Sequence, residues 1–187
     1  MLEEKTSTLT TSNAKLAAKV LDLESRSRRN NIRVIGLPET IEGTQPTAFF
    51  SNMLGEVFGD VLGSPPECER AHRSLAPKPA PHQRPRPVII RLLKFQHKDR
   101  IIREARLKRG QLKFQNHSIL IFEDYPPEVV ELRREYREVM SELYKLNLKP
   151  ALLFPARLTI HCPKSGGRKN VSSVTEAKNL IASHKHD

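Results

Sequence analysis

The chain has 187 residues, enough for one ordinary domain or two small ones. It carries 32 Lys and Arg against 21 Asp and Glu, a formal net charge of +11. An excess of this size favours a polyanionic partner, nucleic acid first and an acidic membrane surface second. Two cysteines are too few for a disulfide framework, and no apolar run approaches the ~20 residues of a membrane span. We therefore expect an intracellular protein that does not enter a membrane.

Catalytic and metal-binding patterns are not found. Neither Cys68 nor Cys162 belongs to a C-x-x-C pair, and His161 beside Cys162 is the nearest approach to a pair of metal ligands. The sequence has no Gly-rich phosphate loop, no H-E-x-x-H and no nucleophile elbow. The adjacent acids Glu123 and Asp124 are interpreted as charges at the start of a helix. We expect no enzyme, no metal, no cofactor and no small-molecule substrate.

Residues 1–28 carry a heptad repeat. Leucines recur every seven residues from Leu2 to Leu23, with Asn13 and Val20 at the alternate seam positions. Such a seam is buried only against partner helices, so the segment is predicted to be the C-terminal part of a longer coiled coil. A lone amphipathic surface helix is the alternative. Lys19 to Glu24 is close to a trimer-favouring pattern that has Arg where Lys19 stands. The predicted trimerisation residues are Leu2, Leu9, Asn13, Leu16, Lys19, Val20, Leu23 and Glu24.

Residues 29–125 are predicted to form an α+β sandwich of a sheet against two helices. Strands are expected at 32–37, 68–75 and 88–95, with helices at 46–59 and 96–109, the latter closed by Gly110. Residues 112–114 and 118–123 form a last strand or a hairpin leading into one. The proline-rich loop 76–87 is expected to be extended, and no role is assigned to it. The order β-α-β-β-α-β is that of an RNA-recognition motif.

Residues 126–187 are predicted to form a small C-terminal α+β nucleic-acid-binding domain. Pro126 and Pro127 suit the start of a helix whose apolar face continues to Asn147. Residues 152–162 alternate as a strand, residues 165–169 form a turn, and residues 172–184 are a closing helix.

Positive charge is concentrated in two places. Residues 84–113 contain eleven Lys and Arg but only two acids, and Arg26, Arg28, Arg29 and Arg33 form a second cluster without an acid between them. A solvated helix face is the alternative explanation, but it does not account for a one-sided concentration over loop, strand and helix. In the expected first strand Arg33 takes the position that is usually aromatic, and residues 86–91 of the third strand contain no aromatic side chain. Binding should therefore rest on phosphate contacts and tolerate many sequences.

Four segments together resemble one known family. Residues 27–39 (SRRNNIRVIGLPE), 86–114, 126–139 and 152–160 (LLFPARLTI) are similar, in this order, to the first-open-reading-frame protein of LINE-type retrotransposons. The resemblance implies a coiled coil, an RNA-recognition motif and a C-terminal domain. It also implies a parallel homotrimer that binds single-stranded nucleic acid, packages its own RNA into particles and acts as a nucleic-acid chaperone.

The resemblance also implies roles for single residues. Arg106 matches an RNA-contacting arginine at the end of the second helix, and Arg133 and Arg134 match a pair that lines the binding cleft. Phe154 stands where the family usually has tyrosine, and Arg157 fills the next basic position. Alternatively, Arg106 is merely solvated, Arg133 pairs with a helix acid, and Phe154 is core. The predicted nucleic-acid-binding residues are Arg26, Arg28, Arg29, Arg33, Arg91, Arg103, Arg106, Lys108, Arg109, Arg133, Arg134, Phe154 and Arg157.

The expected function is that of a trimeric, sequence-tolerant protein that binds single-stranded RNA and DNA in cytoplasmic ribonucleoprotein particles, with the nucleus as a further location. Arg26, Arg28 and Arg29 would then surround the threefold axis and require a polyanion for neutralisation. A coiled-coil interaction scaffold is the alternative. A basic-zipper protein is disfavoured, because here the basic cluster follows the heptads.

Overall fold

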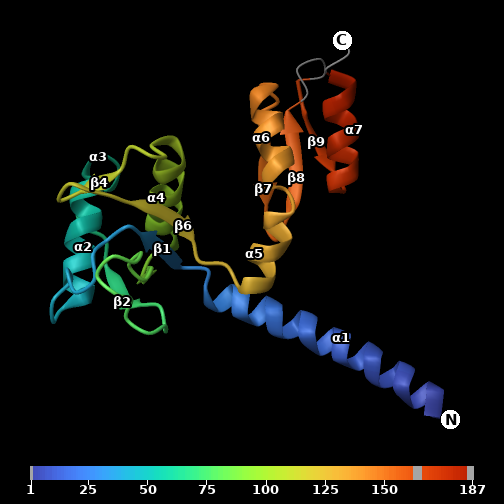
Figure 1. Cartoon of the computed structure of the whole chain (residues 1–187), viewed down its shortest axis with the longest axis horizontal. Coiled ribbons are helices and arrows are strands. Elements are labelled where there is room, and N and C mark those ends of the chain that lie inside the picture. The colour runs from blue at the N-terminus through green and yellow to red at the C-terminus, as the bar shows by residue number, and fades with distance from the viewer. Residues whose placement is uncertain (1, 162–165, 185–187) are drawn as a thin grey trace. The chain divides into compact units, whose positions relative to one another are not determined.

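A computed structural model describes residues 2–161 and 166–184 of the chain (Figure 1). The fold is α+β, with a long N-terminal helix and antiparallel sheets. The chain divides into two compact units, Met1–Asp124 and Tyr125–Asp187. No helix among the described residues is long and apolar enough to cross a membrane.

The N-terminal helix α1 runs over Leu2–Ser27. It contains no Gly or Pro, and Glu3 and Glu4 in its first turn favour the helix dipole. Its heptad residues face solvent within this single chain: Leu9, Leu16, Val20 and Leu23 are 58–69% exposed. The side chain of Leu2 lies outside the described residues. A helix is therefore present as predicted, whereas its assembly into a coiled coil stays a prediction.

The first unit contains a four-stranded sheet in the order β2-β3-β1-β6, with every neighbouring pair antiparallel. A hairpin of β4 and β5 precedes β6, which is the second of the two alternatives predicted for residues 112–123. The elements are β1 (Asn31–Ile35), α2 (Pro46–Val57), α3 (Gly59–Leu62), β2 (Cys68–Arg73), β3 (Val88–Leu92), α4 (Phe95–Leu107), β4 (Lys113–Phe114), β5 (His117–Ser118) and β6 (Leu120–Glu123).

Alternation along the strands divides the sheet into two faces. Ile32, Val34 and Ile90 are fully buried in the core that α2 and α4 complete. Arg33 and Arg91 lie at alternate positions and therefore point to the opposite face, which we call the open face. The alternating residues of β1 and β3 thus give the sheet one apolar and one basic side.

The end of β1 depends on a glycine. Gly36 follows β1 at φ +101°, and a Cβ there would collide with the carbonyl oxygen of Ser118.

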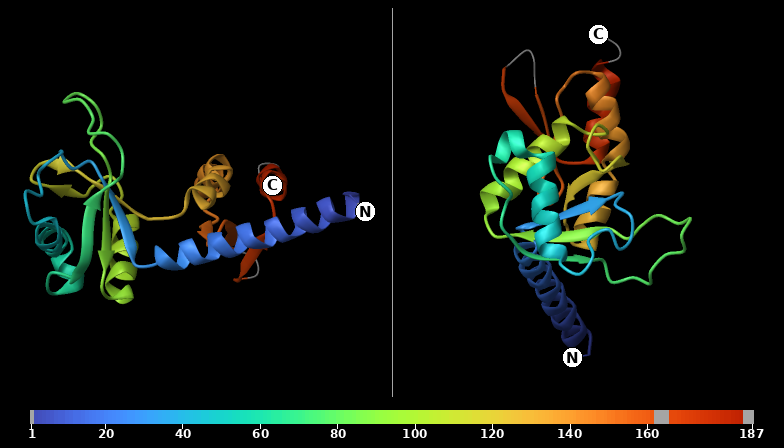
Figure 2. Two further views of the ribbon diagram at one scale, coloured as in Figure 1. Left: turned by 90° about the horizontal axis from the view of Figure 1, so that it is seen from below. Right: turned by 90° about the vertical axis from the view of Figure 1, so that its left-hand side faces the viewer.

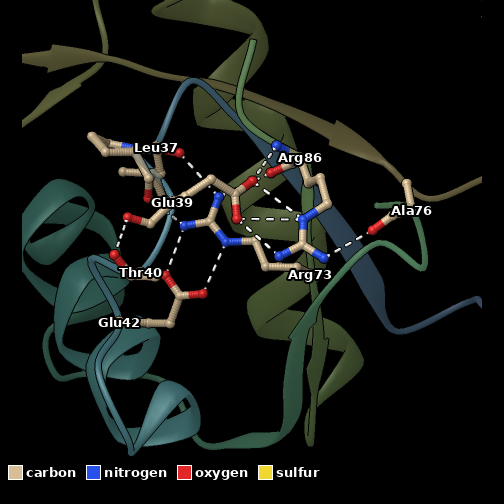
Figure 3. A network of polar contacts seen from close by, with 8 residues as sticks. Leu37, Glu39, Thr40, Glu42, Arg73, Ala76 and Arg86 are labelled. Carbon is tan, nitrogen blue, oxygen red and sulfur yellow. Dashed lines mark hydrogen bonds and ion pairs between the residues drawn. The ribbon is translucent and has the colours of Figure 1, made fainter. Parts of the chain in front are cut away.

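The proline-rich loop 76–87 extends away from the sheet and is coloured green in both views of Figure 2. Two arginines hold its base, an arrangement that we call the loop clamp (Figure 3). Arg73 donates to both carboxylate oxygens of Glu42 and to the carbonyl oxygens of Leu37, Pro38 and Arg86. The Arg86 guanidinium binds Glu39 at 2.9 Å and the Ala76 carbonyl at 3.0 Å. The loop thus begins and ends on one polar network.

Each carboxylate of the loop clamp is stabilised in its charged form. Hydrogen bonds from Arg86 are the main cause that lowers the pKa of Glu39 from an ordinary 4.5 to about 2. Hydrogen bonds from Arg73 likewise lower the pKa of Glu42. Both ion pairs are largely shielded from solvent, since the Arg73 and Glu42 side chains are 6% and 13% exposed.

The second unit packs helices against a three-stranded antiparallel sheet, β7-β8-β9. Val139, Leu143, Leu158, Ile160 and Ala177 are central to its core. Its elements are α5 (Pro127–Arg134), α6 (Arg137–Lys145), β7 (Ala151–Leu153), β8 (Arg157–His161), β9 (Arg168–Val171) and α7 (Val174–His184).

Three sequence predictions for this unit were wrong. The single helix to Asn147 is two helices, because the Tyr136 N–H bonds the Arg133 carbonyl and so tightens the turn between them. The single strand 152–162 is a hairpin of β7 and β8, since Pro155 has no N–H to donate to a ladder. Strand β9 was missed altogether. Cys162 lies outside the described residues.

Candidate nucleic-acid interface

The joint between α1 and β1 is organised by a buried acid. Asp124 is 4% exposed, and it accepts hydrogen bonds from Arg28 (3.1 Å), Arg33 (2.9 Å) and Asn31 (3.1 Å). Its interpretation as a helix-start charge was therefore wrong. Antiparallel pairing of β6 with β1 brings Asp124, the residue after β6, beside Asn31 and Arg33. The Asp124 carboxylate therefore faces the basic cluster. Arg28 and Arg33 consequently hold the end of α1, β1 and β6 together.

The remaining arginines of this joint also have neighbours. Arg26 bonds Asp22 one helical turn earlier at 2.9 Å, and Arg28 also bonds Glu24 at 2.7 Å. The Arg29 guanidinium lies 4.6 Å from the centroid of the Phe95 ring. Acids of the same chain thus partly neutralise the cluster that the sequence shows without an intervening acid.

The basic side chains of α4, and Lys108 just after it, form ion pairs in which the cation is more exposed to solvent. Arg103 bonds Asp99 at 3.0 Å, and Lys108 lies 3.6 Å from Glu104. Arg106 reaches Glu123 of β6 at 2.7 Å, while its own side chain stays 67% exposed. Exposed ion pairs contribute only about 0–1 kcal/mol, so phosphate groups can replace these carboxylates at little cost.

Two further cations of the basic segment 84–113 differ in environment. Arg91, a predicted site residue, bonds Glu69 at 2.8 Å and the Ser27 carbonyl at 3.3 Å. Lys98 was counted in the excess charge, but its side chain is 9% exposed and bonds Glu123 at 2.6 Å. Part of the positive charge therefore stabilises the fold, and the local surface is less basic than the sequence suggests.

In the second unit Arg133 supports an aromatic pair. Its guanidinium donates to the carbonyl oxygens of Leu152, Leu153 and Pro155 and lies 4.7 Å from the centroid of the Tyr125 ring. The Tyr125 and Phe154 rings are 6.1 Å apart and tilted by 33°. Phe154 is 46% exposed, so its alternative interpretation as core is wrong. No ion pair joins Arg133 to an acid among the described residues, contrary to the other alternative.

The last two predicted site residues are both exposed. Arg134 bonds Glu131 at 3.2 Å, with both side chains more than half exposed. Arg157 opens β8 and faces solvent. Arg133, Phe154 and Arg157 thus lie on or beside one hairpin, whereas Arg134 lies on the adjacent turn of α5.

Two aromatic residues at these surfaces were missed by the sequence analysis. Tyr125 contacts the side chains of Arg133 and Phe154, and nothing in its local pattern indicates this. Phe122 is 37% exposed on the open face of the first sheet, beside Arg33. Alternation with buried Ile121 could have located Phe122 from the sequence.

Metal-binding geometry is not seen in the described parts of the chain, where no three His, Cys, Asp or Glu side chains come together. Burial raises the pKa of the Cys68 thiol to about 11, so this cysteine is a poor nucleophile near neutral pH.

Comparison with known proteins agrees with the motifs of the sequence. No protein-family model matches the chain. The mouse (Mus musculus) LINE-1 retrotransposable element ORF1 protein is 28% identical over 148 residues, 78% of this chain and 41% of that protein. The chain is a homologue of LINE-1 ORF1 proteins.

A second relative is likewise described as a LINE-1 type protein. The mouse LINE-1 type transposase domain-containing protein 1 is 25% identical over 190 residues, which cover 96% of this chain and 24% of that protein. The family resemblance drawn from the four sequence segments is thereby confirmed. This ORF1-like chain spans less than half the length of either relative.

Proposed function

We propose that the chain is a homotrimeric, largely sequence-independent binder of single-stranded RNA and DNA. It acts as a nucleic-acid chaperone that packages retrotransposon RNA into ribonucleoprotein particles, in the cytoplasm and also in the nucleus. It is not an enzyme. The homology to the LINE-1 ORF1 protein supports a role in a retrotransposon.

One observation carries the binding proposal: the exposed basic side chains of α4, the helix that packs beside the edge strand β6. Arg103 and Arg106 are 71% and 67% exposed although each has an acidic partner. A phosphate backbone can displace such partners and release counterions, which makes binding sensitive to salt and tolerant of sequence. Rapid exchange of this kind lets strands anneal without ATP.

The proposed trimer rests on the apolar seam of α1. Leu9, Leu16, Val20 and Leu23 repeat at heptad positions and are more than half exposed in a single chain. Partner helices of the same sequence would cover them, with Asn13 setting the register. The two relatives are longer than this chain, so further heptads in the whole protein are compatible with the proposal.

We assign three parts to this function: a coiled coil at 1–28, an RNA-recognition motif at 29–125 and a nucleic-acid-binding domain at 126–187. The strand order β2-β3-β1-β6, with α2 and α4 on one face, supports the second assignment. The exposed Phe154 ring supports the third, because it can stack on bases together with Tyr125, the residue just before this domain.

Light scattering of the chain with and without a single-stranded oligonucleotide tests both parts of the proposal. A trimer that binds the oligonucleotide is expected. Its affinity should fall steeply, by ~10³–10⁵ between 50 and 200 mM salt if six to ten phosphates are contacted. A monomer that ignores the oligonucleotide, or binding with a flat salt dependence, contradicts the proposal.

A second candidate is a coiled-coil interaction scaffold without direct nucleic-acid function. The pairing of Arg28, Arg33, Arg91 and Arg106 with acids of the same chain favours it. In that case, neutralising Arg106, Arg133 and Arg134 would leave the amount of RNA retained by the protein in cells unchanged. A clear loss of RNA would decide for the binding protein.

A further inference from the structure

The open face of the first sheet has one exposed aromatic ring among the residues of its four strands. Phe122 lies on the edge strand β6 and is 37% exposed. The strand register sets it opposite Arg33 of β1, which in turn is opposite Ile89 of β3. Leu120, two residues earlier on the same face, is 38% exposed. A planar apolar surface therefore adjoins a guanidinium at this edge.

A second guanidinium lies over the same ring. Arg109, which follows α4, has its Cζ atom 6.0 Å from the Phe122 centroid, at the outer limit of a cation–π contact. At this distance the Arg109 guanidinium does not cover the face of the Phe122 ring. The carboxylate of Glu123, the next residue of β6, is held by Lys98 and Arg106 from α4. Strand β6 thus carries a ring toward the open face and an acid toward the helix.

We propose that Phe122 is a base-stacking site, with Arg109 and Arg33 binding the phosphates on either side of the stacked nucleotide. This inference rests on the proposed function and adds a specific contact to it. The sequence-based expectation was phosphate binding without rings, since neither β1 nor β3 carries an aromatic side chain on the open face. The ring is instead supplied by the edge strand.

The chemistry of the surroundings favours a nucleotide over an apolar protein segment. Three guanidinium groups, those of Arg33, Arg106 and Arg109, border β6. A ring with cations around it complements a base attached to phosphates. An apolar helix or strand would offer these cations no anion beyond the internal partners of Arg33 and Arg106, Asp124 and Glu123. Every base has a π-face, so the site adds affinity without demanding a sequence.

Phe122→Leu tests the proposal, because it keeps an apolar side chain and removes the ring. Affinity for a uridine oligonucleotide should fall about five- to 140-fold, the range for the loss of one base–aromatic stack. Affinity for inorganic polyphosphate, which offers charge without bases, should stay the same. Tyr144→Leu is the matched control: Tyr144 also presents an exposed ring (60%), but it belongs to α6, which carries none of the predicted binding residues. It should lose less than twofold.

A fluorescence experiment gives an independent readout. The chain has no Trp, so Phe122→Trp introduces a single indole whose emission a stacked base should quench. Quenching by the uridine oligonucleotide, but not by polyphosphate, is expected.

Four results separate the possible failures. If the unchanged chain binds no oligonucleotide, the proposed function itself fails. If it binds but Phe122→Leu binds equally well, or if both variants lose affinity alike, the stacking site is overturned while the function stands. A blue-shifted emission of the introduced indole that the oligonucleotide leaves unchanged would show that a protein segment covers the site, which also overturns the proposal.

Discussion

The loop clamp and the basic surface of α4 beside strand β6 use arginine in opposite ways. This surface, which we call the β6 edge, consists of Arg103, Arg106 and, just after the helix, Arg109. Arg73 in the clamp is buried and bonds both carboxylate oxygens of Glu42 and three carbonyl oxygens. Arg106 at the β6 edge makes one short ion pair and remains 67% exposed. The first guanidinium has no donor to spare for a phosphate, whereas the second can exchange its partner. A count of positive charge therefore overstates the surface that is open to a polyanion.

The largest effect should come from Arg73→Ala. The variant leaves the shielded Glu42 carboxylate without its counterion and three carbonyl oxygens without a donor. Breaking such a pair typically costs about 3–5 kcal/mol of the free energy of unfolding. Urea unfolding followed by circular dichroism measures it. If the loss stays below about 1 kcal/mol, the clamp is no more structural than the β6 edge.

Asp124→Asn should have the next largest effect. The amide keeps the shape of the side chain but weakens charged hydrogen bonds to Arg28 and Arg33, each worth about 1.5–3 kcal/mol. The free energy of unfolding should fall by roughly this amount. Affinity for single-stranded RNA should stay equal or rise, because two guanidinium groups lose an internal counterion. Asp22→Asn, which removes an exposed partner of Arg26, is the control and should leave stability nearly unchanged.

The clamp should also respond to pH in a definite direction. In the folded chain the pKa of Glu39 lies at about 2, below its ordinary 4.5. Its contribution to stability is therefore fully present above pH 4.5 and is lost as the pH falls toward 2. Glu39→Gln should shrink the difference between the urea midpoints at about pH 6 and about pH 3. An unchanged difference would mean that Arg86 does not stabilise the charged carboxylate.

Local patterns predicted much of this fold. The alternation of residues 88–92 placed Ile90 in the core and Arg91 on the open face, as the structure shows. Gly110, at φ +79°, follows α4 where the sequence indicated the end of the helix. The heptad repeat predicted α1. In each case the signal lies within a few residues, where period and turn chemistry act directly.

Contacts between residues that are far apart in the sequence could not be predicted from such local patterns. Arg28 and Asp124 are 96 positions apart, so their ion pair depends on the sheet register and on the end of α1 together. The contact of Tyr125 with Arg133 and Phe154 depends likewise on the hairpin of β7 and β8. The break between α5 and α6 was missed because the apolar pattern continues through it. The sequence therefore indicated which residues belong to the site, but not which residues they contact.

The smallest effect on stability should come from the β6 edge, and it separates the two arginine groups most sharply. Arg103→Ala, Arg106→Ala and Arg109→Ala combined remove three exposed cations, so the free energy of unfolding should change by less than about 1 kcal/mol. If all three contact phosphates, the slope of log affinity for single-stranded RNA against log salt should become shallower by about two. Neutralising the exposed Lys5, Lys15 and Lys178 removes equal charge elsewhere and should leave that slope nearly unchanged. Equal changes in both variants would mean that net charge, and not the β6 edge, attracts the nucleic acid.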